Sequence, residues 1–397
     1  MKRVTVLTAL LALLEVGYAQ EVTLDELITN AKEPQRFEKI LEEEQMSLNK
    51  KSLADTALAP LTINHSISKV NGFGNSNFEY DIGFSKELSL GNAQELERQQ
   101  SHLSTEASIL EERRKIIGFK NELRNLYHQY CLDLEYLNSF EEGYEQITTL
   151  YAKKEKAYRL DEIAKTELLQ LEFEHRALRV ELESIKKKIA DEKGQMLSLS
   201  SVEDVPFSCQ DIYPLRSSVE VESRAFGLTQ EAKEKRLAST HIGLRRYSKK
   251  LDRIEVSTMY TKELDRDLYS VGVSIPLNFT SNRYENEKAS LLHKSSAIEL
   301  QNEEILAQKN YEIKVLTEQL SRVYEAIVAK QENIEYYRSS ILPLMKKSYL
   351  YGESSVMEYL LSRKKLYALQ QRLLEEKKSY YETLFKLYSI GEIEENI

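Results

Sequence analysis

The chain has 397 residues, and its 55 basic and 64 acidic side chains give a formal charge of −9. This acidic balance argues against a nucleic-acid-binding domain, and a mean hydropathy of −0.49 argues against a polytopic helical membrane protein. Two cysteines are too few for a disulfide scaffold. With 13 glycines and 6 prolines the chain has few residues that favour turns, so the composition indicates long, uninterrupted elements.

Residues 1–19 have the pattern of a secretory signal. Two basic residues precede an apolar run over 4–14, and Gly17 and Ala19 are the small residues that a cleavage site after Ala19 requires. The alternative is a buried N-terminal helix. Cleavage at this site would leave no cysteine at the new N-terminus, so we expect no lipid anchor there.

Two landmarks recur in the same order along the chain, which indicates an internal duplication. The segment 80–88 aligns with 269–277 and shares four identical residues with it. The segment 158–178 aligns with 349–369 and shares six. The offsets are 189 and 191 residues, and this near-equality favours duplication over two chance matches.

The duplication divides the chain into two repeats. We predict a first repeat over 20–200, a polar linker over 201–224 and a second repeat over 225–397. Each repeat has the order helix, two strands, very long helix, turn and returning helix. The fold class is therefore mainly α with a small β part, built from a duplicated unit of helix, β-hairpin and long helical hairpin.

In the first repeat, the pattern predicts a helix over 22–57, strands over 61–70 and 78–90, and a helix from Asn92 to about Tyr158. The second strand alternates apolar and polar side chains with a period of two, which gives it one apolar and one polar face. The long helix contains no proline, and it would span roughly 100 Å at 1.5 Å per residue.

A turn near 158–166 leads to a returning helix that starts near Lys165. Residues along this helix step by alternate threes and fours, which predicts the seam of a helical hairpin. The seam residues are Leu168, Leu171, His175, Leu178, Leu182, Ile185 and Ile189. Within this stripe we expect His175 to be a packed seam residue rather than a metal ligand.

The second repeat follows the same plan, with a helix over 227–252, strands over 254–262 and 268–278, and a helix from about residue 281. Pro343 is expected to kink this last helix before a turn near 349–358. A final helix should run to about Ser389.

Cys131 falls in the long helix of the first repeat, and Cys209 falls in the polar linker. The two could oxidise outside the cytoplasm, but these contexts favour two free thiols. The six histidines are scattered, and His65 falls in a strand that could turn it towards a lumen with no ligating partner nearby. We expect no metal site, no cofactor and no catalytic constellation, so the chain is not predicted to be an enzyme.

The four predicted strands have about 9–13 residues each, the length of a tilted transmembrane β-strand. Four strands cannot close a barrel by themselves, and lipid excludes open sheet edges, so insertion into a membrane would require several copies of the chain. Three copies would supply twelve strands. The alternative is a small soluble sheet.

Three short motifs agree with strands that enter a membrane as part of a shared barrel. Ala59-Pro60-Leu61 opens the first strand after a helix, and the segment 270–277 ends a strand with Pro-Leu. The segment 349–360 has the spacing Tyr-x-x-Gly-x-x-x-x-x-Glu-x-Leu at a helical turn. In these motifs the sequence resembles the TolC-type outer-membrane efflux factor family, over essentially all of the chain beyond the signal. Asp161 departs from the family pattern, because it stands where the family usually has glycine.

The resemblance implies a homotrimer in which a shared 12-stranded transmembrane β-barrel tops a long periplasmic α-barrel. Such a trimer would be an outer-membrane channel, the exit duct of a tripartite efflux pump. Its partners would be a periplasmic adaptor, an inner-membrane pump and outer-membrane lipid, with no nucleic acid. The cargo, whether metal ion, drug or protein, stays open. The alternative is a soluble exported coiled-coil adaptor or structural protein of the periplasm.

The resemblance also implies residues at the tip of the helical hairpins. Glu358 matches an acidic position that lines the periplasmic constriction, where a ring of three carboxylates would favour cations. Tyr349 and Glu167 match a latch between the two turns of a protomer, in which a phenol would donate to a carboxylate. The alternatives are a solvated Glu358 and a Tyr349 that packs in a seam. The tip turns expected to dock the adaptor contain Asp161, Glu162, Gly352 and Glu353.

Overall fold

The structure is a computed structural model that describes residues 21–394, apart from 56, 58, 73–74, 220, 222–225, 248–250, 252, 264–265 and 277–281. The expected signal over 1–19 lies outside the described residues, as do residue 56 of the predicted helix over 22–57 and the ends of the predicted strand over 268–278 and of the predicted helix over 227–252.

The first half of the chain forms α2 (Leu24–Thr29), α3 (Lys32–Asp55), β1 (Thr62–Gly72), β2 (Asn75–Ser89), α4 (Ala93–Arg159) and α5 (Lys165–Leu199). One helix was expected over 22–57, but two are present because a local capping arrangement and a long-range bridge separate them. Thr23 and Glu26 form a capping box that begins α2, and Asn30 ends it. Ala31 then makes a β-bridge to Ser200, which interrupts the helical ladder.

The second half forms α6 (Gly227–Tyr247), β3 (Arg253–Lys262), β4 (Asp267–Ser274), α7 (Arg283–Tyr336), the π-helical turn η2 (Tyr337–Ile341), α8 (Leu342–Leu350) and α9 (Val356–Gly391). Pro343 lies in the first turn of α8, directly after η2. Proline has no N–H to donate to the preceding helical turn, and the wider π-helical turn occurs where that bond is missing. The Tyr337 hydroxyl holds this turn against α9 through the Ser362 carbonyl at 3.1 Å.

The chain divides into two compact units, each built from both halves of the sequence. Unit 1 comprises residues 1–37, 115–225 and 309–397, and unit 2 comprises residues 38–114 and 226–308. The units therefore do not coincide with the two predicted repeats. The helices α3, α4 and α7 each contribute residues to both units.

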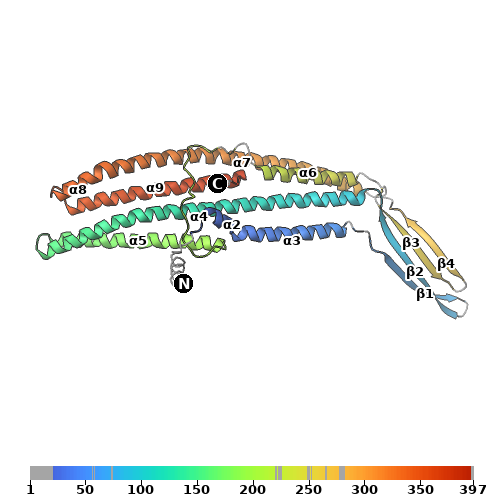
Figure 1. Cartoon of the computed structure of the whole chain (residues 1–397). Helices are drawn as coiled ribbons and strands as arrows, with labels where there is room; N and C mark the ends of the chain where they lie inside the picture. Colours follow the sequence, from blue (N-terminus) through green and yellow to red (C-terminus); the bar gives the residue numbers. More distant parts are fainter. Residues whose placement is uncertain are drawn as a thin grey trace, which may run out of the picture. The chain divides into compact units, whose positions relative to one another are not determined.

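Unit 1 contains two main apolar clusters. The first packs aromatic side chains of α4 and α9, including Tyr127, Tyr380 and Phe385, against α2 and the segment that follows α5. The second lies between α4, α5 and α9 and buries Leu171, Leu178 and Leu182 of the predicted seam, among others. Figure 1 shows α5 returning along α4, and α9 returning along α8 and α7.

His175 lies in this seam as a packed side chain. Its ring stacks between Tyr144 and Tyr151, with centroid distances of 5.1 and 5.3 Å. Its Nε2 atom lies 3.0 Å from the Thr148 hydroxyl. The aromatic and hydroxyl partners both come from α4, so His175 joins the two helices of the first hairpin.

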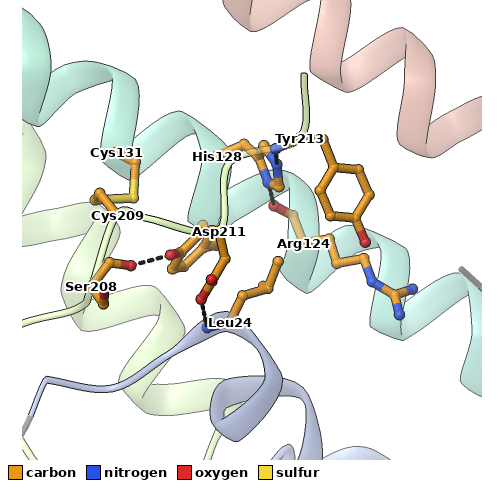
Figure 2. Close-up of a disulfide and its surroundings, with 9 residues drawn as sticks. Leu24, Arg124, His128, Cys131, Ser208, Cys209, Asp211 and Tyr213 are labelled. Carbon is orange, nitrogen blue, oxygen red and sulfur yellow. Dashed lines mark hydrogen bonds between the residues drawn. A yellow bond between two sulfur atoms is a disulfide. The ribbon is translucent and has the colours of Figure 1, made fainter. Parts of the chain in front are cut away.

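Cys131 and Cys209 form a disulfide, so the expectation of two free thiols was wrong (Figure 2). Their Cα atoms are 5.5 Å apart, although 78 positions separate them in the sequence. The physical reason is that residues 201–219, here called the strap, do not form a loose polar linker. Phe207 and Tyr213 of the strap are buried in the first cluster, and their packing brings Cys209 onto α4.

Hydrogen bonds add to this attachment of the strap. His128 of α4 donates from Nδ1 to the Arg124 carbonyl at 2.8 Å, and its Nε2 accepts the Tyr213 N–H at 2.9 Å (Figure 2). The Tyr127 hydroxyl donates to the Ser208 carbonyl. Burial lowers the pKa of His128 to about 4, outweighing the hydrogen bond to Arg124 that raises it. His128 therefore holds the strap as a neutral ring.

Unit 2 contains the β-sheet. The four strands pair antiparallel in the order β1-β2-β3-β4, so the two hairpins of the two sequence halves lie side by side through β2 and β3 (Figure 1). The α6 helix contacts α4 within the same unit, where the Ser239 hydroxyl donates to the Gln100 carbonyl at 3.1 Å. Arg246 and Glu97 form an ion pair at 3.0 Å between the same two helices.

Candidate functional site

The α4–α5 and α8–α9 connections are two copies of one backbone turn. In the first, the N–H groups of Asp161 and Glu162 donate to the carbonyls of Tyr158 and Ala157, at 3.0 and 2.9 Å. In the second, residues 191 positions later make the same two bonds at 3.1 and 2.9 Å. Both patterns are Schellman motifs, which end a helix with one left-handed residue.

The left-handed residue is Asp161 in the first turn, with φ 57°, and Gly352 in the second, with φ 73°. Aspartate tolerates this conformation better than most residues, because its short polar side chain can bond locally. The departure from glycine at position 161 therefore leaves the turn intact.

The two turns differ in how the next helix begins. Ser355 caps α9 and forms a capping box with Glu358, whose carboxylate accepts the Ser355 N–H at 2.7 Å. The residue at the same place before α5 is Ala164, which has no capping side chain. Glu167 occupies the position equivalent to Glu358. Because Ala164 cannot form a capping box with it, Glu167 binds another partner.

That partner is Lys154 of α4. Its ammonium donates to Glu167 at 2.9 Å, and it also lies 5.5 Å from the centroid of the Tyr349 ring. Burial lowers the pKa of Lys154, but the bond to Glu167 and the neighbouring Tyr349 outweigh it, so this pKa is raised. Glu167 and Tyr349, expected to bond directly, are thus brought together through the charge of Lys154.

Tyr349 also stacks on Tyr359 of α9, with ring centroids 5.6 Å apart and an interplanar angle of 10°. The remaining expected tip residues Asp161, Glu162, Gly352 and Glu353 are exposed on the two turns. The Glu358 side chain is exposed as well, and its bonds to Ser355 fix it at the first turn of α9.

Sequence reasoning missed Lys154 and Ser355. The Ser355-x-x-Glu358 spacing is a capping-box pattern that the sequence displays. Lys154 could have been noticed by comparing the repeats, because the residue 191 positions later is Met345. Only the fold shows that the Lys154 side chain reaches the second turn.

The register of the sheet separates its side chains into two faces. One face is apolar and exposed, and its pairs include Ile63 with Phe84, and Ile67 with Tyr80. It continues across β3 and β4 through Tyr260, Tyr269, Val271 and Val273. His65 pairs with Ile82 and lies on this apolar face.

The opposite face of the sheet is mostly polar. Ser66 pairs with Asp81, and the Ser66 hydroxyl donates to the Asp81 carboxylate at 2.7 Å. Asp81 in turn pairs with Thr261 of β3. Of the strands that the structure describes, β1 and β4 are the outer ones, and each has one side unpaired within this chain.

Among the described residues, no group of three or more His, Cys, Asp or Glu side chains is arranged to hold a metal ion. Within the same ranges, no helix combines the length and the apolar character needed to cross a membrane.

Comparison with known proteins gives matches only at the level of structure. No family model matches the sequence, and no curated protein sequence matches it. Solved structures do match over almost the whole chain. VceC, an outer membrane protein from Vibrio cholerae, superposes with a TM-score of 0.70 at 14% identity, over 93% of this chain and 96% of that one.

Two outer membrane channels give similar values. The CmeC channel of Campylobacter jejuni has a TM-score of 0.71 at 13% identity, over 93% of this chain and 85% of its own. The open-state MtrE channel of Neisseria gonorrhoeae has a TM-score of 0.66 at 14% identity, over 92% and 87%. The resemblance to TolC-type outer-membrane efflux channels is confirmed for the fold, and this chain has the fold of those proteins.

Proposed function

We propose that this chain is an outer-membrane channel, the exit duct of a tripartite efflux pump. One observation carries the proposal: the four-stranded sheet exposes an apolar face opposite a polar one and has two unpaired edges. A soluble protein rarely exposes so large an apolar surface, whereas lipid requires one. The shared fold with outer membrane channels supports the same conclusion.

The unpaired edges of the sheet favour a homotrimer. Lipid does not tolerate open edges, so β4 of one copy would pair with β1 of the next until the sheet closes. Three copies would give a 12-stranded barrel with the apolar face towards lipid and the Asp81 face towards water. The helices would then lie in the periplasm.

The paired turns would form the periplasmic tip of the duct. We assign Glu358 to the constriction, where three copies would place three carboxylates around the axis and favour cations. Glu167, Lys154 and Tyr349 would form the latch between the two turns of each protomer. The exposed residues Asp161, Glu162, Gly352 and Glu353 would dock a periplasmic adaptor, which connects the duct to an inner-membrane pump.

Planar-bilayer recording tests this function. The purified protein, added from detergent, should produce discrete conductance steps with a preference for cations, and Glu358→Gln should reduce that preference. The control is Glu353→Gln, a neutralisation on the adjacent turn that should leave the preference closer to wild type. A protein that never inserts would instead favour a soluble exported coiled-coil protein.

A further inference from the structure

The two cysteines of the disulfide differ in burial. Cys131 lies in the middle of α4 and is 1% exposed. Cys209 lies on the strap, packs against the first cluster and is only partly buried. Figure 2 shows Cys209, on the strap, joined by the disulfide to Cys131 of α4. In a folded chain, a large reagent would therefore reach Cys209 and not Cys131.

The strap that carries Cys209 also holds the first described helix. Asp211 accepts the Leu24 N–H at 3.2 Å, which caps the start of α2 (Figure 2). The backbone of Val22 bonds to the two strap residues that flank Phe207. Its N–H donates to the Pro206 carbonyl at 3.0 Å, and its carbonyl accepts the Ser208 N–H at 2.9 Å. Closing the disulfide therefore fixes the position of the strap and of the hydrogen bonds that hold the start of α2.

We propose that Cys209 is the thiol through which an exported protein disulfide oxidant closes this bond, and that Cys131 is the resolving thiol. The partner is defined by its chemistry, a protein with a reactive disulfide that accepts two electrons. This inference rests on the exported location proposed above. Oxidation then follows the packing of the strap on α4, because only packing places the two sulfur atoms within reach.

The exchange balances in two steps. The Cys209 thiolate attacks one sulfur of the oxidant's disulfide, which forms a mixed disulfide and expels the second sulfur as a thiolate. The Cys131 thiolate then attacks the Cys209 sulfur, forming the Cys131–Cys209 bond and expelling the first sulfur of the oxidant. The chain loses two protons and two electrons, and the oxidant becomes a dithiol.

Labelling with a bulky maleimide tests the difference in access. Cys131→Ser leaves only the Cys209 thiol, and Cys209→Ser leaves only the Cys131 thiol, so the two variants lack the same disulfide. In the purified folded proteins, we expect Cys209 to react at least tenfold faster than Cys131. In denaturant the two rates should become equal, and circular dichroism checks that both variants keep their helices. Equal rates in folded proteins would overturn the assignment.

Trapping in cells tests the order of events. Exported samples are quenched with acid and alkylated, and adducts are separated without reductant. Cys131→Ser should give a mixed disulfide with the oxidant, and Cys209→Ser should give none. An adduct through Cys131 alone would contradict the proposal, because it would mean that oxidation precedes folding. The labelling uses purified protein and needs no conductance, so its failure is distinct from failure of the proposed channel function.

Discussion

The two copies of the tip turn are nearly identical in backbone, and single residues make them different. Ala164 stands where the second turn has Ser355, so Glu167 is not used in a capping box. Lys154 then binds Glu167 and lies against Tyr349 of the other turn. Two side-chain differences, Ala164 for Ser355 and Lys154 for Met345, thus give the first turn a contact that the second turn lacks.

The first prediction concerns this contact. Lys154→Met replaces the ammonium with the residue that stands at the equivalent position in the second repeat, Met345. The change removes the ion pair with Glu167 and the cation over Tyr349. If these contacts hold the tip closed, the channel formed by the variant should open several-fold more often in single-channel recordings.

The matched control for this prediction is Lys153→Met. Lys153 is the exposed neighbour, and the change removes the same charge from α4. It should leave the opening frequency at the wild-type value. Equal effects of the two substitutions would assign the change to net charge and not to the latch.

The second prediction concerns His128 and pH. Its folded-state pKa of about 4 lies below the ordinary value of 6.5, so the unfolded chain binds the proton more readily. The stability that depends on neutral His128 is complete above pH 6.5 and is lost as the pH falls towards 4, by about 3 kcal/mol. Urea unfolding of wild type at pH 7.5 and 4.5 should show this loss.

The variant His128→Gln keeps a polar side chain but cannot titrate. Its stability should therefore change less between pH 7.5 and 4.5 than that of wild type. His241→Gln removes an exposed histidine instead and should keep the wild-type dependence. A wild-type slope in His128→Gln would contradict the role given to this ring.

At the scale of elements, the backbone of each turn decides which residues it accepts. Gly352 has a φ of 73° with open space around it, so the penalty for a side chain there is conformational rather than steric. Gly194 lies within α5, also in open space, with ordinary helical geometry. The same substitution should therefore have opposite effects at the two sites.

The third prediction follows from this contrast. Gly352→Ala should destabilise the protein by about 1 kcal/mol, because an L-residue is strained in the left-handed region. Gly194→Ala should stabilise it by about 0.5–1 kcal/mol, because alanine loses less entropy in a helix. Thermal midpoints measured by circular dichroism compare the two. A higher midpoint for Gly352→Ala would show that the turn is not left-handed in solution, and a lower midpoint for Gly194→Ala would contradict the expectation for α5.

The main elements could be predicted because their causes are local. The strands show a period of two, and the long helices lack proline and repeat apolar residues by threes and fours. The break between α2 and α3 was missed because part of its cause is a bridge from Ala31 to Ser200, which are far apart in the sequence. The π-helical turn before Pro343 was expected only as a kink.

The disulfide and Lys154 were not predicted for the same physical reason. Both depend on contacts between segments that only the packed helices bring together. The composition of the strap favours a loose loop, yet Phe207 and Tyr213 bury it against α4. Glu358, Tyr349 and Glu167 could be named only because their spacing resembles a known family, and their assigned roles remain proposals.

At the scale of the whole molecule, a single chain leaves the hydrogen-bonding groups of its sheet edges unpaired. Its sheet has two edges that are unpaired within the chain and an exposed apolar face. Neither water nor lipid suits every part of such a protomer, because water disfavours the apolar face and lipid disfavours the edges. A closed assembly of three copies in an outer membrane would satisfy both.

Fractionation followed by native mass measurement tests whether the chain forms this trimer in an outer membrane. We expect the protein to be found in the outer membrane, to need detergent for extraction, and to have three times the protomer mass once extracted. A protein that is recovered without detergent from the periplasm, with the mass of a single protomer, would contradict it.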